Sequence, residues 1–455
     1  MQNKIIKLIT IVAILPILGL GCKGSGTISQ ESLDPVTLEY WRVFDEPSNL
    51  SAINTTFKTL YPNITVNIKK VRYEEFKDKF ILALAEGSGP DIISVHTNWL
   101  KEYQKYLSKM PEAVTMPTAY LDGKEIRIKL QTTRLPSTRD IYNNFIDTVS
   151  EDVIIGSDIY GLPLGVDTLV LYYNRAMLNQ ANIPFPPATW TEFKDQIKLL
   201  TIQDSSGKIV QSGTSLGGAR NINRAPDILA TLMMQNGTQM TNGGSVTFNQ
   251  IPTNTQNQEN EENQVVPGRD ALRFYTDFAS PAKEIYTWNE DMPEALDAFA
   301  NQQVAFFFGY SYHLPLIRSL GADVDLGIAR LPQINTDASQ SNTANYWMES
   351  VTNQSKHKNE AWAFINFATS AQNVTSFLSS ANKPTALRAL ISSQIANQDM
   401  APFANQLLTA KTWYHGRDAS AMEEAMRVMI EDVVNGTKLP TEAINEAVAS
   451  INLTY

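Results

Sequence analysis

The first hundred residues alternate between stretches with the apolar spacing of strands and stretches with that of helices. Three stretches are predicted as strands: VTLEYW (36–41), NITVNIKKV (63–71) and DIISV (91–95). The intervening residues 48–61 and 73–86 carry apolar positions at helical spacing, and a Gly-Ser-Gly-Pro run ends the second helix. This order of strands and helices predicts an α/β fold with a largely parallel sheet covered by helices.

Ligands of such sheets bind beyond the carboxyl ends of the strands. The residues to consider first are therefore the polar and aromatic ones that follow the first and third strands, which are Arg42, Asp45, Glu46, His96, Asn98 and Trp99. We expect any binding site to lie at this edge of the sheet.

Later segments add a break, a helix and a second region of strands. In YGLPLGVDTLVLYYN, a proline and a glycine interrupt the chain ahead of an apolar strand. Thr189 and Glu192 have capping-box spacing and predict a helix that follows them. Val304 to Phe308 is predicted as a buried strand, whereas residues 122–140 fit either a surface excursion or a loop at the edge of a cleft.

The N-terminal residues have the pattern of a secretory signal. Two lysines are followed by an apolar stretch, residues 8–20, and by small residues that lead to Cys22. The pattern resembles a bacterial lipoprotein signal, which implies that residues 1–22 carry the signal, that Cys22 is acylated, and that the polar residues 23–34 form a flexible tether. Gly19 departs from that signal, in which leucine is preferred three residues before the cysteine. A plain cleaved signal or a short membrane anchor is the alternative.

Composition limits the classes to which the body of the chain can belong. The 455 residues carry a formal net charge of -10, which argues against a nucleic-acid partner because phosphate binding needs clustered Lys and Arg. Cys22 is the single cysteine, so the body has neither disulfides nor thiolate ligands. Its four histidines lie far apart in the sequence, so we expect no metal site, and no motif calls for a cofactor. A body of about 420 residues exceeds what one core supports, which predicts two domains.

Segments spread over nearly the whole chain match, in order, those of one family. They include FKTLYPNITVNI, ILALAEGSGPDII, YGLPLGVDTLVLYYNRAML, PPATWTEFKDQIKLLT, ALDAFANQQVAFFFGYSY, NEAWAFINFATSAQN and ANKPTALRAL. In this order the chain resembles the extracellular solute-binding proteins of ABC importers, family 1, to which maltose-binding protein belongs. The resemblance implies a two-lobe periplasmic-binding-protein-like fold, in which each lobe is a largely parallel sheet flanked by helices, and it implies no enzymatic activity.

The resemblance also implies a hinge of several segments between the lobes. The crossings are expected at residues 163–165, 333–345 and 382–385. Lobe 1 then comprises residues 35–164 and 346–383, and lobe 2 comprises residues 165–345 and 384–455.

Candidate ligand-binding residues come from the resemblance and from strand ends. Sugars present hydroxyls at the ring edge and C–H groups at the ring face, so their sites combine carboxylates and amides with aromatic rings. By position in the resemblance, Asp167, Tyr310 and Trp413 contact the ligand, with a hinge hydrogen bond as the alternative role for Asp167 and core packing for the two rings. Further candidates at strand ends or in loops are Trp41, Asp45, Asn98, Trp99, Trp288, Trp347 and Arg417.

A G-x-S-x-G motif around Ser215 raises a competing hypothesis, a surface hydrolase on an α/β body. The residues before the motif are barely apolar, and those after it give no strong helix start. No fixed spacing links Ser215 to a histidine that would complete a catalytic triad. We therefore favour a loop near the mouth of the cleft for this segment.

The sequence thus predicts a lipid-anchored, extracytoplasmic substrate-binding component of an ABC importer. A carbohydrate is the favoured ligand, and a polyamine, a phosphodiester or a peptide is the alternative solute. The expected partners are the permease subunits and, through the lipid alone, the membrane, and we expect a monomer. Closure of the lobes around the ligand is the expected mechanism, because a ligand that contacts both lobes in the closed form shifts the population toward it.

Overall fold

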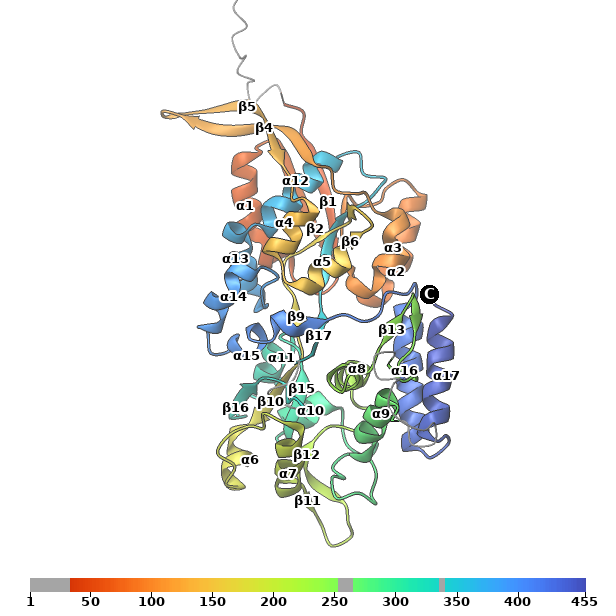
Figure 1. The fold of residues 1–455 in the computed structure, drawn as a ribbon. Helices are drawn as coiled ribbons and strands as arrows, with labels where there is room; N and C mark the ends of the chain where they lie inside the picture. Colours follow the sequence, from red (N-terminus) through yellow and green to blue (C-terminus); the bar gives the residue numbers. More distant parts are fainter. Residues whose placement is uncertain (1–32, 253–264, 335–339) are drawn as a thin grey trace, which may run out of the picture.

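The computed structural model describes residues 33–252, 265–334 and 340–455. Within these ranges, buried apolar side chains form two cores, each built around a five-stranded sheet. The two sheets lie one above the other along the long axis of the molecule, with helices around them (Figure 1). The predicted α/β class and two-lobe architecture are confirmed. The predicted signal, Cys22 and nearly all of the predicted tether lie outside the described residues.

The first lobe contains every element that the opening pattern predicts, each displaced by at most a few residues. The segment before the first helix forms a short 3-10 turn, Pro47–Leu50. The helices and strands of this lobe are β1 (Val36–Arg42), α1 (Ser51–Leu60), β2 (Ile64–Lys70), α2 (Tyr73–Ala85), β3 (Ile92–His96), α3 (Leu100–Tyr103), β4 (Ala113–Asp122), β5 (Glu125–Arg134), α4 (Thr138–Asn144), α5 (Asp147–Val153), β6 (Ile154–Ile155), β7 (Asp158–Ile159), β8 (Leu162–Pro163), β18 (Trp347–Val351), α12 (Lys358–Thr369), α13 (Ala371–Ala381) and α14 (Arg388–Ile395).

The first sheet is mixed and contains one reversed strand. Its strand order is β2-β1-β3-β18-β8. β1 pairs in parallel with β2 and β3, whereas β18 pairs antiparallel with β3 and β8. Four strands, β8 included, therefore run in one direction, and the prediction of a largely parallel sheet fails only for β18. The reason is that β18 enters directly from the hinge and runs away from the other lobe, opposite to β3.

The second lobe departs further from the prediction. In its sheet, with order β11-β12-β15-β10-β16, the β12–β15 pair is parallel, and β10 is antiparallel to both of its neighbours. The cause is the same, since β10 starts just after a crossing between the lobes. The elements of this lobe are β10 (Val170–Asn174), α6 (Arg175–Gln180), α7 (Trp190–Leu200), β11 (Ile202–Gln203), β12 (Ile209–Thr214), α8 (Ala225–Gln235), β13 (Thr241–Asn242), β14 (Ser245–Val246), α9 (Pro267–Asp277), α10 (Ala295–Ala300), β15 (Val304–Gly309), α11 (His313–Leu320), β16 (Leu326–Ala329), α16 (Ala419–Val434) and α17 (Pro440–Asn452).

The capping box predicted ahead of α7 is present. The Glu192 backbone N–H donates to Thr189 Oγ1 at 3.2 Å, and the Thr189 N–H donates to the Glu192 carboxylate at 3.3 Å. These two bonds satisfy donors that the first turn of a helix otherwise leaves unpaired. The start of this helix is therefore a local property of the sequence.

A three-stranded sheet joins the lobes. β17 (Asn342–Asn345) pairs with β9 (Asp167–Thr168) on one side and with β19 (Ala410–Lys411) on the other. Two of these strands lie at or next to the predicted first and second crossings. At the predicted third crossing, 382–385, Thr385 forms an isolated antiparallel bridge with Gly165, and the Val166 N–H donates to the Pro384 carbonyl oxygen at 3.1 Å. Asn382, at the start of this segment, has a φ of 50° and ends α13 in a left-handed turn.

The chain after this turn still packs against the first lobe. Ala386 and Leu387 belong to the first core, whereas Met400 and Phe403, the latter in α15 (Ala401–Ala404), belong to the second. Further on, Ala404, Leu407 and Ala410 belong to the first core again. The boundary at 383/384 stays a prediction, because the chain beyond it contacts both cores.

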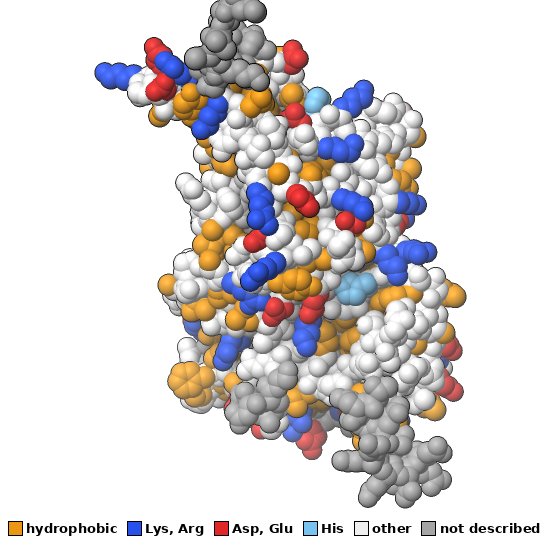
Figure 2. Space-filling view, turned by 45° about the horizontal axis from the view of Figure 1, so that its top comes forward, with side chains coloured by type: hydrophobic (Ala, Val, Ile, Leu, Met, Phe, Trp, Pro, Cys, Tyr) orange, Lys and Arg blue, Asp and Glu red, His pale blue; other side chains and the backbone are white. Residues whose placement is uncertain are grey.

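Other parts of the surface lie away from the junction of the lobes. The β4–β5 hairpin projects from the first lobe, so this segment is a surface excursion (Figure 1). On the face seen in Figure 2, Lys and Arg side chains are interspersed with Asp and Glu and do not merge into one basic patch. No helix in the described part of the chain is long and apolar enough to cross a membrane.

Candidate functional site

A cavity of about 720 Å³ lies between the two lobes. This volume falls in the range of about 300–1,000 Å³ that small-molecule sites occupy. Residues that follow β1 and β3, residues of the hinge, and loops and helix starts of the second lobe all line the cavity. The lining combines aromatic rings with carboxylate, amide and guanidinium groups, which equips the cavity to hold a polar molecule with apolar faces.

Four rings from the first lobe form what we call the aromatic wall: Phe44, Tyr73, Trp99 and Trp347. The ring centroids of Tyr73 and Trp99 lie 5.3 Å apart, those of Trp99 and Trp347 5.1 Å, and those of Phe44 and Tyr73 5.7 Å. Phe44 is 59% exposed and Tyr73 37%. Contiguous exposed rings are uncommon unless they bind something, so the wall is a candidate contact surface for a ligand.

The second lobe contributes Tyr312 to the same cavity. Tyr312 follows β15, is 37% exposed, and stacks on the buried ring of Tyr310 with a centroid distance of 6.0 Å. The Lys383 ammonium lies 5.9 Å from the centre of the Tyr312 ring. Each lobe therefore supplies aromatic surface to one cavity.

A buried cluster of charges lies on the first-lobe side. Arg42 contacts Asp45 at 2.6 Å and Glu349 at 3.1 Å, and Ser94 donates to the other Glu349 oxygen at 2.6 Å. Burial raises the pKa of Glu349, and the positive charge of Arg42 partly counteracts this rise. Burial also acts to raise the pKa of Asp45, but Arg42 and Lys383 outweigh it and lower that pKa. Arg42, at 3% exposure, thus fixes two carboxylates at the cavity.

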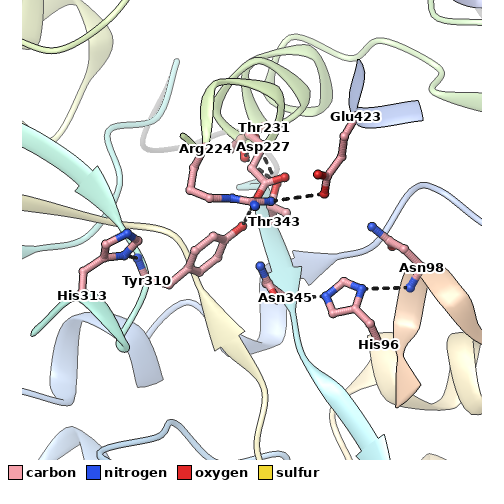
Figure 3. A network of polar contacts seen from close by, with 10 residues as sticks. All are labelled: His96, Asn98, Arg224, Asp227, Thr231, Tyr310, His313, Thr343, Asn345 and Glu423. Atoms are coloured by element: carbon pink, nitrogen blue, oxygen red, sulfur yellow. Dashed lines mark hydrogen bonds and ion pairs between the residues drawn. The ribbon is translucent and has the colours of Figure 1, made fainter. Parts of the chain in front are cut away.

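A second polar network comes from the second lobe (Figure 3). Arg224 donates from Nε and Nη2 to Asp227 Oδ2 at 2.9 and 2.6 Å, and the Tyr310 hydroxyl donates to the same oxygen at 2.6 Å. Glu423, from α16, lies 3.7 Å from Arg224. Arg224 and Glu423 line the large cavity, whereas Asp227 lies behind them.

His96 connects the end of β3 to the hinge. Its Nδ1 accepts the Asn98 backbone N–H at 3.2 Å, so the ring proton is assigned to Nε2, which lies 3.1 Å from Asn345 Oδ1 (Figure 3). Burial lowers the pKa of His96 to about 4, despite the contact with Asn345. The ring is therefore neutral at physiological pH and orients an amide of strand β17.

This lowered pKa predicts a pH dependence of stability. Between pH 6.5 and pH 4 the unfolded chain protonates His96 and the folded protein does not, so the free energy of unfolding falls as the pH falls in that window. Between pH 7 and pH 5, the free energy of unfolding of the wild type should fall by about 1–2 kcal/mol more than that of His96→Gln. Urea unfolding at the two pH values measures both changes. Equal losses in both proteins would contradict this assignment.

Asp167 has contacts that favour the hinge role over ligand binding. It is 6% exposed and accepts hydrogen bonds from the Ser311 N–H at 2.9 Å, the Ser311 hydroxyl at 2.6 Å and the Thr168 N–H at 2.9 Å. It lines the cavity, but these bonds use most of its acceptor capacity. They tie the hinge strand β9 to the end of β15.

Tyr310 and Trp413 do not line the large cavity. Both border a small adjoining cavity of about 20 Å³, which is the size of a single water site. Tyr310 is fully buried, and Trp413 packs edge-to-face on Phe248 at 6.1 Å. Two residues beyond Tyr310, Tyr312 occupies the exposed position instead.

Three further candidates lie away from the cavity. Trp41 is 8% exposed in the first core, with the Lys69 ammonium 5.0 Å from its ring. Trp288 is fully buried in the second core and donates from Nε1 to Asn221 Oδ1 at 2.8 Å. Arg417 is exposed and lines neither cavity. Trp41 and Trp288 therefore pack in the two cores, because the strand and the loop that carry them direct their side chains inward.

The remaining strand-end candidates are brought together. Asp45, Asn98, Trp99 and Trp347 all line the cavity, as do Arg42 and His96, which the strand-end rule also indicated. Strand-end reasoning did not single out the cavity residues that lie on helices or in loops of either lobe. These are Phe44, Tyr73, Asn223, Arg224, Tyr312, Lys383 and Glu423. The signal for Tyr312 was its place just after a buried strand, in FFFGYSY.

The surroundings of Ser215 do not support the hydrolase hypothesis. Its hydroxyl is buried and has no hydrogen-bond partner in the part of the chain that the structure describes, so no histidine is placed to activate it. Within those same ranges, no group of three or more His, Cys, Asp or Glu side chains is arranged to hold a metal ion.

Comparisons with known proteins agree with this geometry. The family model described as "Bacterial extracellular solute-binding protein" matches residues 43–375. A putative binding protein of Brucella abortus (strain 2308) is 24% identical over 142 residues, 31% of this chain and 29% of that protein. A galactooligosaccharide-binding protein of Bacillus subtilis (strain 168) is 27% identical over 90 residues, 18% of this chain and 19% of that protein. The chain thus matches less than a third of the length of these curated relatives.

Solved structures show the same fold over almost the whole chain. A cyclo/maltodextrin-binding protein in complex with maltotetraose has a TM-score of 0.69 at 17% identity, with 93% of this chain and 98% of that one covered. The sugar-binding protein MalE of Xanthomonas citri has a TM-score of 0.68 at 17% identity, with 92% and 97% covered. A solute-binding protein of Thermotoga lettingae, bound with α-D-tagatose, has a TM-score of 0.64 at 20% identity, with 92% and 99% covered. Because the family model covers well over half of the sequence, the chain belongs to the bacterial extracellular solute-binding protein family, whose members bind solutes and are not enzymes.

Proposed function

We propose that the protein is the substrate-binding component of an ABC importer and that it captures a carbohydrate between its lobes. The observation that carries this proposal is the aromatic wall of the first lobe, which shares one cavity with Tyr312 of the second. Sugar rings present C–H faces that pack on aromatic rings and hydroxyls that bind carboxylates and amides. Relatives with the same fold are described as bound to maltotetraose and to tagatose, which supports this ligand class.

Closure of the lobes explains how binding is signalled. Trp99 packs against both cores, and the Lys101 ammonium lies 5.0 Å from the ring of Tyr455, which belongs to the second lobe. A ligand that contacts the aromatic wall and Tyr312 together gains those contacts in the closed arrangement alone. Its differential affinity shifts the population toward the closed form, which is the form that docks on the permease.

The proposal is tested by calorimetry and small-angle X-ray scattering across a panel of oligosaccharides. We expect at least one member to bind with a measurable heat and to reduce the radius of gyration. A panel that includes polyamines and peptides separates a carbohydrate from other solutes. No binding and no compaction with any saccharide would refute the proposal.

We also propose that the protein is held at the outer face of the cell membrane by acylation of Cys22. The support is the signal pattern in the sequence, together with a family described as extracellular. Mass spectrometry of the N-terminal peptide from the membrane fraction should find a lipid on Cys22. Cys22→Ala should release the protein from that fraction, and retention of this variant would contradict the anchor.

Tyr312 provides a test of the second-lobe contact. We expect Tyr312→Ala to lower the affinity for the best ligand of the panel by about tenfold, because an exposed ring lost from a binding site costs about 1–2 kcal/mol. Phe185→Ala, which removes a ring that is 75% exposed in the same lobe but outside the cavity, should leave the affinity unchanged. Calorimetry at one temperature gives both values, and equal effects would argue against Tyr312 as a contact.

A further inference from the structure

The cations that line the cavity are already compensated by carboxylates. Arg42 is held by Asp45 and Glu349, and the Lys383 ammonium lies 3.9 Å from the other oxygen of Asp45. Arg224 directs Nε and Nη2 to the oxygen of Asp227. An anionic ligand would therefore have to compete with these carboxylates for a positive charge.

Carboxylates outnumber cations in the lining. Five carboxylates, those of Asp45, Glu74, Asp167, Glu349 and Glu423, stand against the three cations named above. Asp45 and Glu349 are tied to Arg42, and Asp167 is tied to Ser311 and Thr168. Glu74 is 71% exposed at the rim, 3.9 Å from Arg72. Carboxylate oxygens that already accept hydrogen bonds from the protein have little capacity left to accept one from a ligand.

Glu423 differs from the other inner carboxylates. Its nearest cationic atom, Arg224 Nη2, is 3.7 Å away, beyond normal hydrogen-bond length, and that nitrogen already donates to Asp227 at 2.6 Å. The Glu423 side chain is 36% exposed. It approaches the cavity from the second lobe, whereas Asn98 approaches it from the first (Figure 3). A ligand donor placed between them would give Glu423 a closer hydrogen bond than its ion pair with Arg224 at 3.7 Å.

We propose that Glu423 gives this cavity a charge preference, so that a saccharide with an ammonium group is bound more tightly than its hydroxyl counterpart and a saccharide with a carboxylate is bound least. This inference rests on the proposed carbohydrate-binding function and names the class of sugar within it. An ammonium group supplies a closer partner for Glu423 than Arg224 does, and the ring of Tyr73, which is close enough to Glu423 to feel its charge, favours a cation at the same end of the cavity. A uronate would meet Glu423 and Glu74, and Arg224, the cation paired with Glu423, already donates to Asp227.

The test uses oligosaccharides of one length in three forms, built from glucose, glucosamine or glucuronate, titrated into the full chain by calorimetry at neutral pH. We expect the amino form to bind about tenfold more tightly than the neutral form and the uronate about tenfold more weakly. Glu423→Gln keeps the size and hydrogen bonding of the side chain but removes its charge. It should weaken the amino form about tenfold and the neutral form less than about threefold.

Glu424→Gln is the matched control, because it makes the same change of charge one residue further along α16, at a side chain that is 69% exposed and outside the cavity. It should leave all three affinities unchanged. Glu423→Lys should reverse the order of the amino and uronate forms, and thermal unfolding confirms that each variant is folded. If no form binds, the proposed function itself fails. If the neutral form binds but the preference is absent, or survives in Glu423→Gln, the inference about Glu423 fails and the proposed function stands.

Discussion

Replacing Arg42 with methionine is expected to lower the free energy of unfolding by about 3–5 kcal/mol, the cost of leaving buried carboxylates without their cation. Arg42 is 3% exposed and contacts both Asp45 and Glu349, and Glu349 is itself 3% exposed. Methionine fills a similar space, so the loss reports the charge more than the packing. Urea unfolding at pH 7 measures it. The loss should shrink at acidic pH, where Glu349, whose pKa burial already raises, takes up a proton.

Two further variants separate the ion pair from its surroundings. Lys70 lies opposite Arg42 in the β1–β2 register and pairs with Glu46, but both of these side chains are exposed. Lys70→Met should therefore cost less than about 1 kcal/mol. Adding Glu349→Gln to Arg42→Met should restore more than about half of the lost stability, because the unpaired charge is removed. A loss of the same size in the double variant would show that packing, not charge, accounts for the effect.

The fold could be predicted where local and periodic signals act over short distances. The capping box at Thr189 and the alternating strand of residues 64–70 are determined by neighbours in the sequence, and both are present. The role of residues 382–385 could not be fixed from the sequence, because Asn382 and Pro384 give the signal of a chain break. A helix cap and a crossing share that signal, and tertiary packing alone distinguishes them. The direction of β18 and of β10 likewise depends on the end of the sheet at which the chain enters from the hinge.

The site could be predicted where a rule of topology applies. Asn98 and Trp99 follow β3, and the carboxyl ends of parallel strands meet at one edge, so their presence at the cavity follows from the strand order. Tyr73 and Glu423 start or lie on helices that the sequence places on no particular face of a cleft. Trp288 and Tyr310 show the opposite failure, since a large ring has the same signature in a core as in a binding site. The choice between Tyr310 and Tyr312 depends on which way the loop after β15 turns.

The aromatic wall predicts a large effect on binding when one of its rings is removed. Trp347 begins β18 directly after the hinge, and its ring lies edge-on to Phe44 at 5.6 Å, to Trp99 at 5.1 Å and to His96 at 5.2 Å. The ring thus lines the cavity and also packs against Phe44 and Trp99. Preorganised rings lose little entropy when a ligand binds, so their removal costs more than the area alone suggests.

We therefore expect Trp347→Ala to lower the affinity for the best saccharide ligand by about 30- to 100-fold, or about 2–3 kcal/mol. Trp41→Ala is the control, because Trp41 lies in β1 of the same sheet but packs in the core and outside the cavity. It should destabilise the protein by about 3 kcal/mol yet change the affinity less than about threefold, measured by calorimetry at a temperature where both variants are folded. An unchanged affinity in Trp347→Ala, or a matching loss in Trp41→Ala, would show that the wall is part of the core and that the ligand binds elsewhere.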